Sequence, residues 1–375
     1  MSEDERYRAS TQFRLWSFTL YALHAQRTQT NLNAAARVRA AVRRVREVRR
    51  ADTPDGGNGN VPSMAPEAET DCLTVEEEKK LIAFYCRQAL DLGDFLGLGN
   101  EVKATAVQYI KRFYVTNSVM TYSPADILKT ALFFATKTEN HYFRLTKFAE
   151  KLPNTKAEDI LALEFLLTQG LRFTFDVRHP YRALEGAVME LLAIANHDVP
   201  LLPGVEGAYP PKPHNMQNRV FAVHSNARQY LKISALLTDV YFHFTPSQIM
   251  MASLLIADSS LTEWFISSKF PSTAEAEEVK LKILATITSC ADMLREVNPI
   301  RSKEEIDLER SQMKPLGKKL NKCRNPEKMD LVALQKSKRE GDGGVDEKVI
   351  KKRKMEKEKF AKEGEDLFGP GLKGS

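Results

Sequence analysis

Two stretches of the chain, residues 122–139 and 244–259, are copies of one apolar segment. Each copy has Ser or Thr followed by Pro, and then a run of apolar residues. Proline costs no hydrogen bond at the first position of a helix, so the copies predict helices that begin at Pro124 and Pro246. Almost no polar face is left, and a helix of that kind is buried on most sides. The chain is therefore predicted to fold around two central helices.

The copies lie 122 residues apart, from position 124 to position 246. Solenoid repeats recur about every 20–50 residues. The spacing here is longer, so it favours two related domains in tandem. The copies differ at Lys137, near the end of the first copy, because Ser259 holds its position in the second copy. The difference suggests a function for the first copy only. A lysine in the last turn also complements the helix dipole and is commonly just solvated, so both interpretations stay open.

The remaining apolar patterns are helical, and no segment alternates as a strand does. In the first half, helices are predicted from Thr74, which forms a capping box with Glu77, and over 101–116, 124–139, 144–152 and 157–171. In the second half they are predicted over 217–238, 246–259, 262–268 and 274–297, after a bridging segment at 178–186. The fold class is all-α, with an N-terminal helix and linker at 1–73, five-helix domains at 74–177 and 178–298, and a charged, mostly disordered tail at 299–375.

The net charge of +6 is unevenly distributed. Residues 1–51 hold 11 arginines and 4 acidic residues, and residues 299–375 hold 21 basic and 15 acidic residues, which leaves a net charge of −7 for residues 52–298. An acidic folded region argues against a nucleic-acid-binding core.

The N-terminal arginines surround a valine and alanine stripe between Val38 and Val48, which predicts an amphipathic basic helix. Such a helix lies on a membrane, on nucleic acid, or on an acidic domain of its own chain. The stripe lacks the large apolar residues that enter membranes, so the membrane is the weakest of these alternatives.

Several classes of function find no support in the sequence. There is no run of 18 apolar residues that would span a membrane and no signal peptide. The cysteines, Cys72, Cys86, Cys290 and Cys323, form no CxxC pair, so no metal or other cofactor is expected, and their scatter fits a reducing compartment. None of the seven histidines lies in a catalytic motif, and no phosphate-binding loop occurs. A binding module is therefore expected rather than an enzyme.

Four motifs resemble the cyclin family, and within it the cyclin H group. They are STQFRLWSF at 10–18, KRFYVTNSV at 111–119, ATKTE at 135–139 and HPYRALEG at 179–186. The resemblance covers residues 10–298 and implies that the two helical domains are tandem cyclin boxes.

The resemblance implies a regulatory subunit that binds a cyclin-dependent kinase. In cyclins a lysine at the end of the third helix and a glutamate in the fifth form a pair at the kinase interface, and the matching positions are Lys137 and Glu164. Phe173 and Phe175 match apolar positions that pack on the C-helix of the kinase. Binding holds that helix inward, which places the catalytic groups of the kinase, so activation is allosteric.

Resemblance to cyclin H further implies membership of the CDK-activating kinase, with a ring-finger assembly subunit and the TFIIH core as partners. The complex would phosphorylate the C-terminal domain of RNA polymerase II and the activation loops of other kinases. The basic run Lys351, Lys352, Arg353 and Lys354 is typical of a nuclear localisation signal, so a nuclear protein is expected. The helix after Thr74 lacks the substrate-docking patch of cell-cycle cyclins.

Two alternatives remain at this point. A transcriptional cyclin of the C or K type would bind a different kinase by the same mechanism. A nucleic-acid-associated factor of the TFIIB type shares the doubled helical fold, but such factors carry an N-terminal zinc ribbon and basic repeats, which this sequence lacks.

Overall fold

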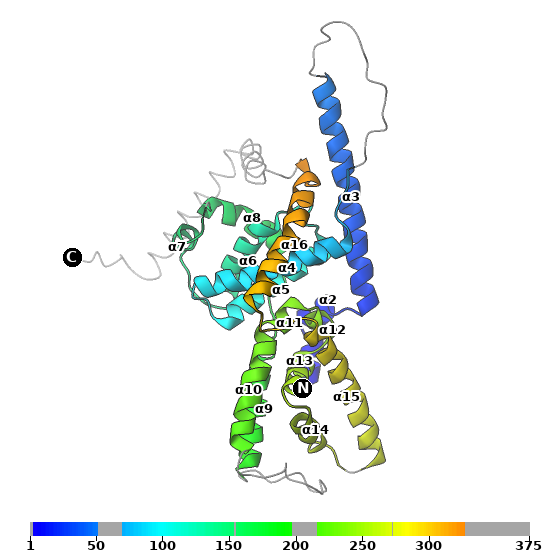
Figure 1. Ribbon diagram of the computed structural model, residues 1–375, viewed down its shortest axis with the longest axis vertical. Coiled ribbons are helices and arrows are strands. Elements are labelled where there is room, and N and C mark those ends of the chain that lie inside the picture. Colours follow the sequence, from blue (N-terminus) through cyan, green and yellow to red (C-terminus); the bar gives the residue numbers. More distant parts are fainter. Residues whose placement is uncertain (1–2, 52–69, 154, 197–215, 272, 327–375) are drawn as a thin grey trace, which may run out of the picture. The chain divides into compact units, whose positions relative to one another are not determined.

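The computed structural model describes residues 3–51, 70–153, 155–196, 216–271 and 273–326. Every regular element in these ranges is a helix (Figure 1). Three helices precede the first domain: α1 (Glu3–Ala9), α2 (Thr11–Trp16) and α3 (Leu20–Ala51). The first domain contains α4 (Val75–Phe95), α5 (Asn100–Thr116), α6 (Pro124–Thr138), α7 (Leu145–Glu150) and α8 (Ala157–Gly170).

The second domain repeats this layout and is followed by one more helix. Its elements are α9 (Tyr181–Ala195), α10 (Met216–Lys232), α11 (Ser234–Leu237), α12 (Val240–His243), α13 (Pro246–Ala257), α14 (Ser259–Ser267) and α15 (Ala274–Arg295), and α16 (Lys303–Lys322) comes last. None of the described helices has the length and the apolar character that crossing a membrane requires.

The two predicted central helices, α6 and α13, lie at the centres of their domains. Helix α6 packs on α4, α5 and α8, and α13 packs on α9, α10, α14 and α15. The corresponding residues Ile127 and Ile249 are both fully buried. The doubled all-helical fold is thus confirmed.

The starts of the two central helices differ. The Thr245 hydroxyl accepts from the Gln248 backbone N–H at 3.3 Å, and the Gln248 side chain accepts from the Thr245 N–H at 2.9 Å, so the two residues form a capping box. Ser123 holds the N-cap position of α6 but makes no side-chain capping bond. Pro124 therefore starts α6 without help from the serine.

Two segments of the second domain differ from the sequence-based expectation. The segment 178–186, taken as a bridge, leads at Tyr181 into the full helix α9. The single helix expected over 217–238 is broken at Ile233, where φ is −124° and ψ is −67°. The break lets the Ser234 hydroxyl donate to the Val297 carbonyl at 2.6 Å. This contact joins α11 to the end of α15, which no local pattern specifies.

The basic helix α3 packs on the chain's own first domain. Its stripe residues Val38 and Ala41 are fully buried, and α3 contacts both α4 and α5. The Thr30 hydroxyl also donates to the Val115 carbonyl of α5 at 2.9 Å. Of the three placements that the sequence left open, the apolar stripe takes the one on a domain of its own chain, although that first domain is not itself acidic.

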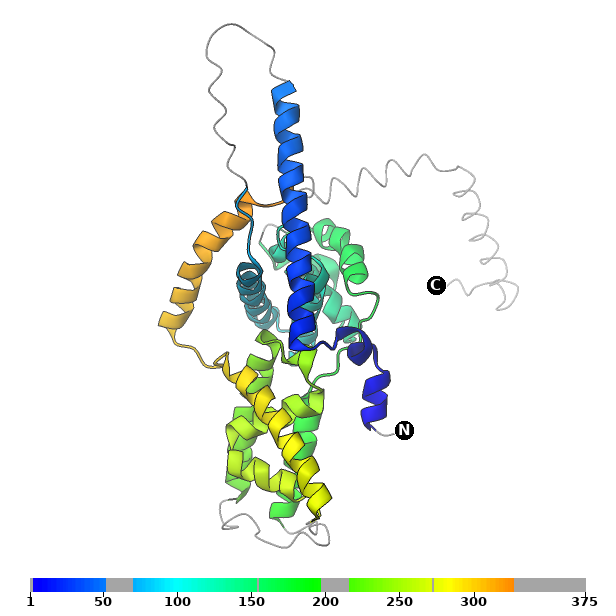
Figure 2. The same ribbon diagram turned by 90° about the vertical axis from the view of Figure 1, so that its right-hand side faces the viewer.

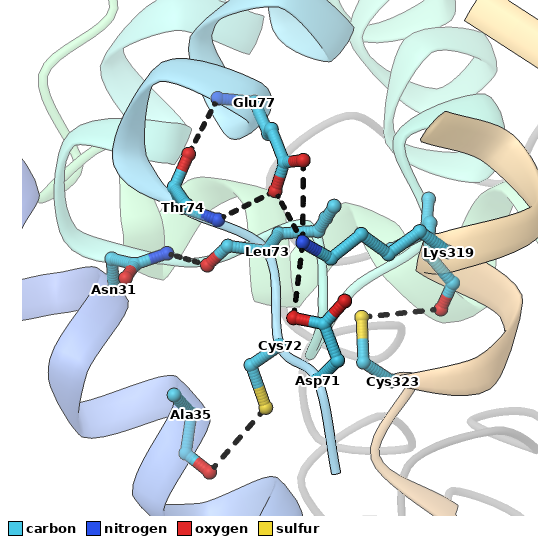
Figure 3. Close-up of polar contacts among 10 residues, drawn as sticks. Asn31, Ala35, Asp71, Cys72, Leu73, Thr74, Glu77, Lys319 and Cys323 are labelled. Atoms are coloured by element: carbon cyan, nitrogen blue, oxygen red, sulfur yellow. Dashed lines mark hydrogen bonds and ion pairs between the residues drawn. The ribbon is translucent and has the colours of Figure 1, made fainter. Parts of the chain in front are cut away.

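The segment before α4 is held by α3 and by α16 (Figure 3). The Asn31 side chain of α3 donates to the Leu73 carbonyl at 2.8 Å. From α16, the Lys319 ammonium lies 3.1 Å from an Asp71 carboxylate oxygen and 2.9 Å from one of Glu77. Helices α3 and α16 are thereby both fixed to the start of the first domain.

Helix α16 lies in the region that was expected to be mostly disordered. The sequence after residue 299 is poor in apolar residues, but the chain is helical from Lys303 to Lys322. Its last turn buries Leu320, and Cys323 just after it is fully buried. A few well-placed anchors therefore order this helix despite its low apolar content. The predicted localisation signal at 351–354 lies outside the described residues.

A buried acid on α4, Glu78, makes the stability of the fold depend on pH. Its side chain accepts from the Ser118 hydroxyl, and burial raises its pKa from 4.5 to about 7 in spite of hydrogen bonds from Ser118 and Asn31. Between these pH values the unfolded chain releases the proton and the folded chain keeps it. Stability is therefore fully present below pH 4.5 and is lost as the pH rises towards 7.

We expect Glu78→Gln to remove this pH dependence. Each unit of pKa shift corresponds to about 1.4 kcal/mol, so the buried glutamate should lower the free energy of unfolding of the wild type by about 3 kcal/mol between pH 4.5 and 7. Urea unfolding of both proteins at pH 5 and pH 7.5 measures it. Glu278→Gln, at an exposed pair with Lys282, serves as the control with unchanged pH dependence. An equal fall in stability for wild type and Glu78→Gln would refute the assignment.

Candidate functional site

Lys137 and Glu164 are brought together from two helices of the first domain. Lys137 is in the last turn of α6 and Glu164 is in the middle of α8, and the ammonium lies 2.5 Å from a carboxylate oxygen. The lysine side chain remains 44% exposed and the glutamate 19%. The ammonium also lies 4.8 Å from the centre of the Phe133 ring. The two charges are thus held in place while the lysine stays accessible to a partner.

Phe173 and Phe175 follow α8 at different depths. Phe173 is 61% exposed. Phe175 is half-buried and packs edge to face on Phe134 of α6, with ring centres 5.0 Å apart, and its carbonyl accepts from the Tyr109 hydroxyl at 2.6 Å. Phe173 is therefore the aromatic side chain available to a partner. Phe175 packs against α6, and its contact with a kinase remains a prediction.

The backbone that presents Phe173 is strained. Arg172 and Phe173 both have φ of +54°, a region that costs a residue with a side chain on the order of 1–2 kcal/mol. The turn satisfies the end of α8, since the Phe173 N–H donates to the Thr168 carbonyl at 3.0 Å. Strain of this kind persists only where the surrounding structure fixes the conformation.

Two apolar residues of α8 belong to this surface and were not singled out from the sequence. Leu161 is 45% exposed and Phe165 is 62% exposed. They flank Glu164 and lie one turn apart, because residues four positions apart share a helix face. The signal was present in the pattern: the large buried residues of α8 are Ile160, Leu163 and Leu167, with the small Ala162 beside them, and positions 161 and 165 fall outside that stripe.

The N-terminal motif holds the segment that carries both phenylalanines. The buried Trp16 of α2 donates its indole N–H to the Thr174 hydroxyl at 2.9 Å. The guanidinium groups of Arg112 and Arg172 lie 5.3 and 5.2 Å from its ring centre. The Gln12 side chain accepts from the Arg178 N–H at 2.7 Å. Residues 172–178 are therefore fixed by helix α2.

A neutral histidine links the two domains just after this segment. Burial, with the positive charge of Arg112, lowers the pKa of His179 to about 3. Thr105 donates to a Glu139 carboxylate oxygen at 2.6 Å, so its hydroxyl oxygen accepts from Nε2–H of His179 at 2.8 Å. Nδ1 then accepts from the Tyr241 hydroxyl at 2.9 Å. This chain of hydrogen bonds fixes the linker between the first and the second domain.

A cluster of buried charged side chains also joins the two domains, and its lysine comes from α5. The Lys111 ammonium donates to the Thr238 carbonyl and lies 3.6 Å from an Asp239 carboxylate oxygen. Arg27 of α3 makes two hydrogen bonds to the same carboxylate, at 2.6 and 2.9 Å. Burial alone would raise the pKa of Asp239, but Arg27 and Lys111 together hold it well below its usual value.

The arrangement is suited to binding a partner. Across the described residues, no group of three or more histidine, cysteine, aspartate or glutamate side chains could hold a metal ion. The first domain instead presents one ion pair bordered by exposed apolar side chains. When a partner protein binds such a surface, the apolar border is buried and the charges fix the orientation of the partner.

Comparison with known protein families identifies the scaffold. The model of the cyclin N-terminal domain matches residues 90–176, and the model of the cyclin C-terminal domain matches residues 179–295. The boundary between the two matches falls between α8 and α9. The chain belongs to the cyclin family.

Individual relatives place the chain within this family. A chain in the solved structure of the CAK complex from Chaetomium thermophilum bound to ATP-gamma-S is 40% identical, with a TM-score of 0.73, and the match covers 93% of this chain and 98% of that one. Cyclin-H from Xenopus laevis is 26% identical over 98% of this chain and 100% of its own length. Cyclin CCL1 from Saccharomyces cerevisiae is 32% identical over 74% of this chain, which spans 64% of the yeast protein. The chain belongs to the cyclin H group.

Proposed function

We propose that this chain is the regulatory subunit of a CDK-activating kinase and has no catalytic activity of its own. The observation that supports the proposal most directly is the close likeness to a chain of the solved CAK complex over nearly its whole length. The Lys137–Glu164 pair on the first cyclin box supplies a surface for the kinase.

The mechanism we propose is allosteric. The kinase C-helix lies on the first cyclin box, where Leu161, Phe165 and Phe173 lose water and Lys137 and Glu164 fix its register. The free pair is partly exposed and contributes only about 0–1 kcal/mol to stability. Once a partner covers the pair, additional hydrogen bonds from that partner decide its contribution. The binding energy shifts the kinase towards its active conformation.

The wider assignment rests on membership of the cyclin H group. We propose that the complex includes a ring-finger assembly subunit, associates with the TFIIH core and works in the nucleus. Its proposed substrates are the C-terminal domain of RNA polymerase II and the activation loops of other cyclin-dependent kinases. Capture of the full chain from nuclear extract, followed by identification of the bound kinase and its associated subunits, tests this assignment.

Removal of the ion pair tests the site itself. We expect Lys137→Ala with Glu164→Ala to lower kinase activation at least about tenfold, since loss of buried interface charges costs on the order of 2 kcal/mol or more. The free protein should lose less than about 1 kcal/mol of stability. Titration of purified kinase with each protein, with peptide phosphorylation as the readout, measures the effect.

The matched control removes another exposed pair. Lys282 and Glu278 on α15 lie 2.6 Å apart, and both are mostly exposed. Lys282→Ala with Glu278→Ala should leave activation unchanged. Full activation by the Lys137 and Glu164 double variant would rule out the proposed site without affecting the assignment to the cyclin H group.

A further inference from the structure

A cavity of about 370 Å³ lies where the two cyclin boxes meet the segment that follows α15. Its walls come from α4, the start of α5, the start of α9, the end of α10 and residues 299–306. Figure 2 shows the short connection from α15 to α16, which supplies Pro299 and Arg301 to one wall. The cavity is many times larger than one water molecule needs, so it has room for a larger ligand.

Two buried polar groups that line the cavity have no hydrogen-bond partner among the described residues. They are the hydroxyl of Tyr181 on α9 and the Nε–H of Arg87 on α4. The Glu309 carboxylate lies 3.7 Å from that nitrogen, which is too far for a hydrogen bond. Burial raises the pKa of Tyr181, so its hydroxyl keeps a proton to donate. Buried donors are nearly always satisfied in native proteins, and an exception points to a water molecule or an ion in the site.

The lining also contains a cation without a counter-charge. Lys232, the last residue of α10, is half-buried and forms no hydrogen bond or ion pair within the described part of the chain. Its pKa is lowered by burial and then by the positive charges of Arg228 and Lys103. In the same way, burial and the neighbouring Arg301 lower the pKa of Arg87. An anion in the cavity would offset these effects, because it favours the charged form of both side chains.

The acidic residues nearby leave this positive charge in place. Asp94 pairs with Lys103, and Glu309, outside the lining, pairs with Arg301 at 2.6 Å. Asp91, the other carboxylate of the lining, is exposed. Water molecules would satisfy the unpartnered donors, but they would not neutralise the two cations. The ligand that the cavity favours is therefore an anion.

The donors come from four different helices, which suits a tetrahedral phosphate better than a planar carboxylate. Besides Arg87, Lys232 and Tyr181, the cavity is lined by Asn100, the first residue of α5. The N-cap residue of that helix, Gly99, makes no side-chain capping bond, and an open helix N-terminus favours phosphate groups. A phosphate monoester brings a charge of about −1.5 to −2 and three acceptor oxygens. Those oxygens can accept from several directions at once.

We propose that this cavity binds the phosphate group of a phosphate monoester. The group is carried either by a phosphorylated serine or threonine of a partner protein or by a free small molecule. Lys232 and Arg87 neutralise its charge, and the Tyr181 hydroxyl donates to one of its oxygens. The site is shared by the two boxes and does not depend on the proposed kinase-binding surface.

Calorimetric titration of the full-length protein tests the proposal. The ligands are inorganic phosphate and N-acetyl-phosphoserine amide, each at the same ionic strength. We expect Lys232→Met to weaken binding at least about tenfold, since it removes a hydrogen bond between charged groups. Tyr181→Phe should weaken binding about fivefold. It should not lower the free energy of unfolding in phosphate-free buffer, because the hydroxyl has no partner to lose.

The matched control is Lys282→Met, which removes an exposed lysine of α15 and should leave the affinity unchanged. An equal loss of affinity in this variant would overturn the proposal, because net charge would then explain the binding. Absence of saturable binding to the wild type would also overturn it, since the cavity would then hold only water. Tighter binding of the phosphoserine derivative would identify a protein side chain as the source of the phosphate, and tighter binding of inorganic phosphate would identify a free anion.

Discussion

Replacement of Asp239 by alanine is expected to lower the free energy of unfolding by about 3–5 kcal/mol, because it leaves two buried cations without their counter-charge. Lys111 is 5% exposed and Arg27 is 12% exposed, and both face the Asp239 carboxylate. The three residues come from α5, α3 and the turn before α12. Urea unfolding, followed by circular dichroism at pH 7, measures the loss.

Two further variants make this expectation specific. Asp239→Ala combined with Lys111→Met should cost less than the sum of the single changes, since removal of an uncompensated buried charge restores part of the loss. Asp292→Ala, which breaks the exposed pair with Arg295, should cost less than about 0.5 kcal/mol. A cost below about 1 kcal/mol for Asp239→Ala would show that water compensates the two cations.

The fold class could be predicted because its evidence is local and occurs twice. Each central helix is apolar on nearly all sides and begins with a proline, and burial of such a helix leaves few alternatives to a bundle. The second domain was harder to predict from its connections. The bond from Ser234 to Val297 joins residues 63 apart, and the helix break at Ile233 that allows it has no breaker residue in the sequence.

The candidate site was predictable in part. Lys137 and Glu164 were chosen by resemblance to cyclins, and the structure places their charged atoms 2.5 Å apart. Spacing alone could not have paired them, since 27 residues separate them. The exposure of Leu161 and Phe165 could have been found from the buried stripe of α8. The depth of Phe175 could not, because it depends on its contact with Phe134.

Trp16 connects the N-terminal motif at residues 10–18 to the first cyclin box. No pattern within the motif itself predicts this contact. Its indole N–H reaches Thr174, 158 residues away in the chain. The side chain is 1% exposed, and Arg172, whose guanidinium flanks its ring, adjoins the strained Phe173. The position of Phe173 on the candidate site therefore depends on a tryptophan from a different part of the chain.

We expect Trp16→Ala to cost about 3–5 kcal/mol of local stability and to release both α2 and residues 172–178. Hydrogen exchange of the Phe173 and Thr174 amides should accelerate by at least two orders of magnitude, while amides of α13 in the second box stay protected. Trp16→Phe keeps an aromatic ring beside Arg112 and Arg172 but loses the bond to Thr174 and part of the buried indole volume, so it should cost less than Trp16→Ala. If α2 alone lost protection and Phe173 kept it, the strained turn would be held by α8 itself, and Trp16 would have no part in presenting the site.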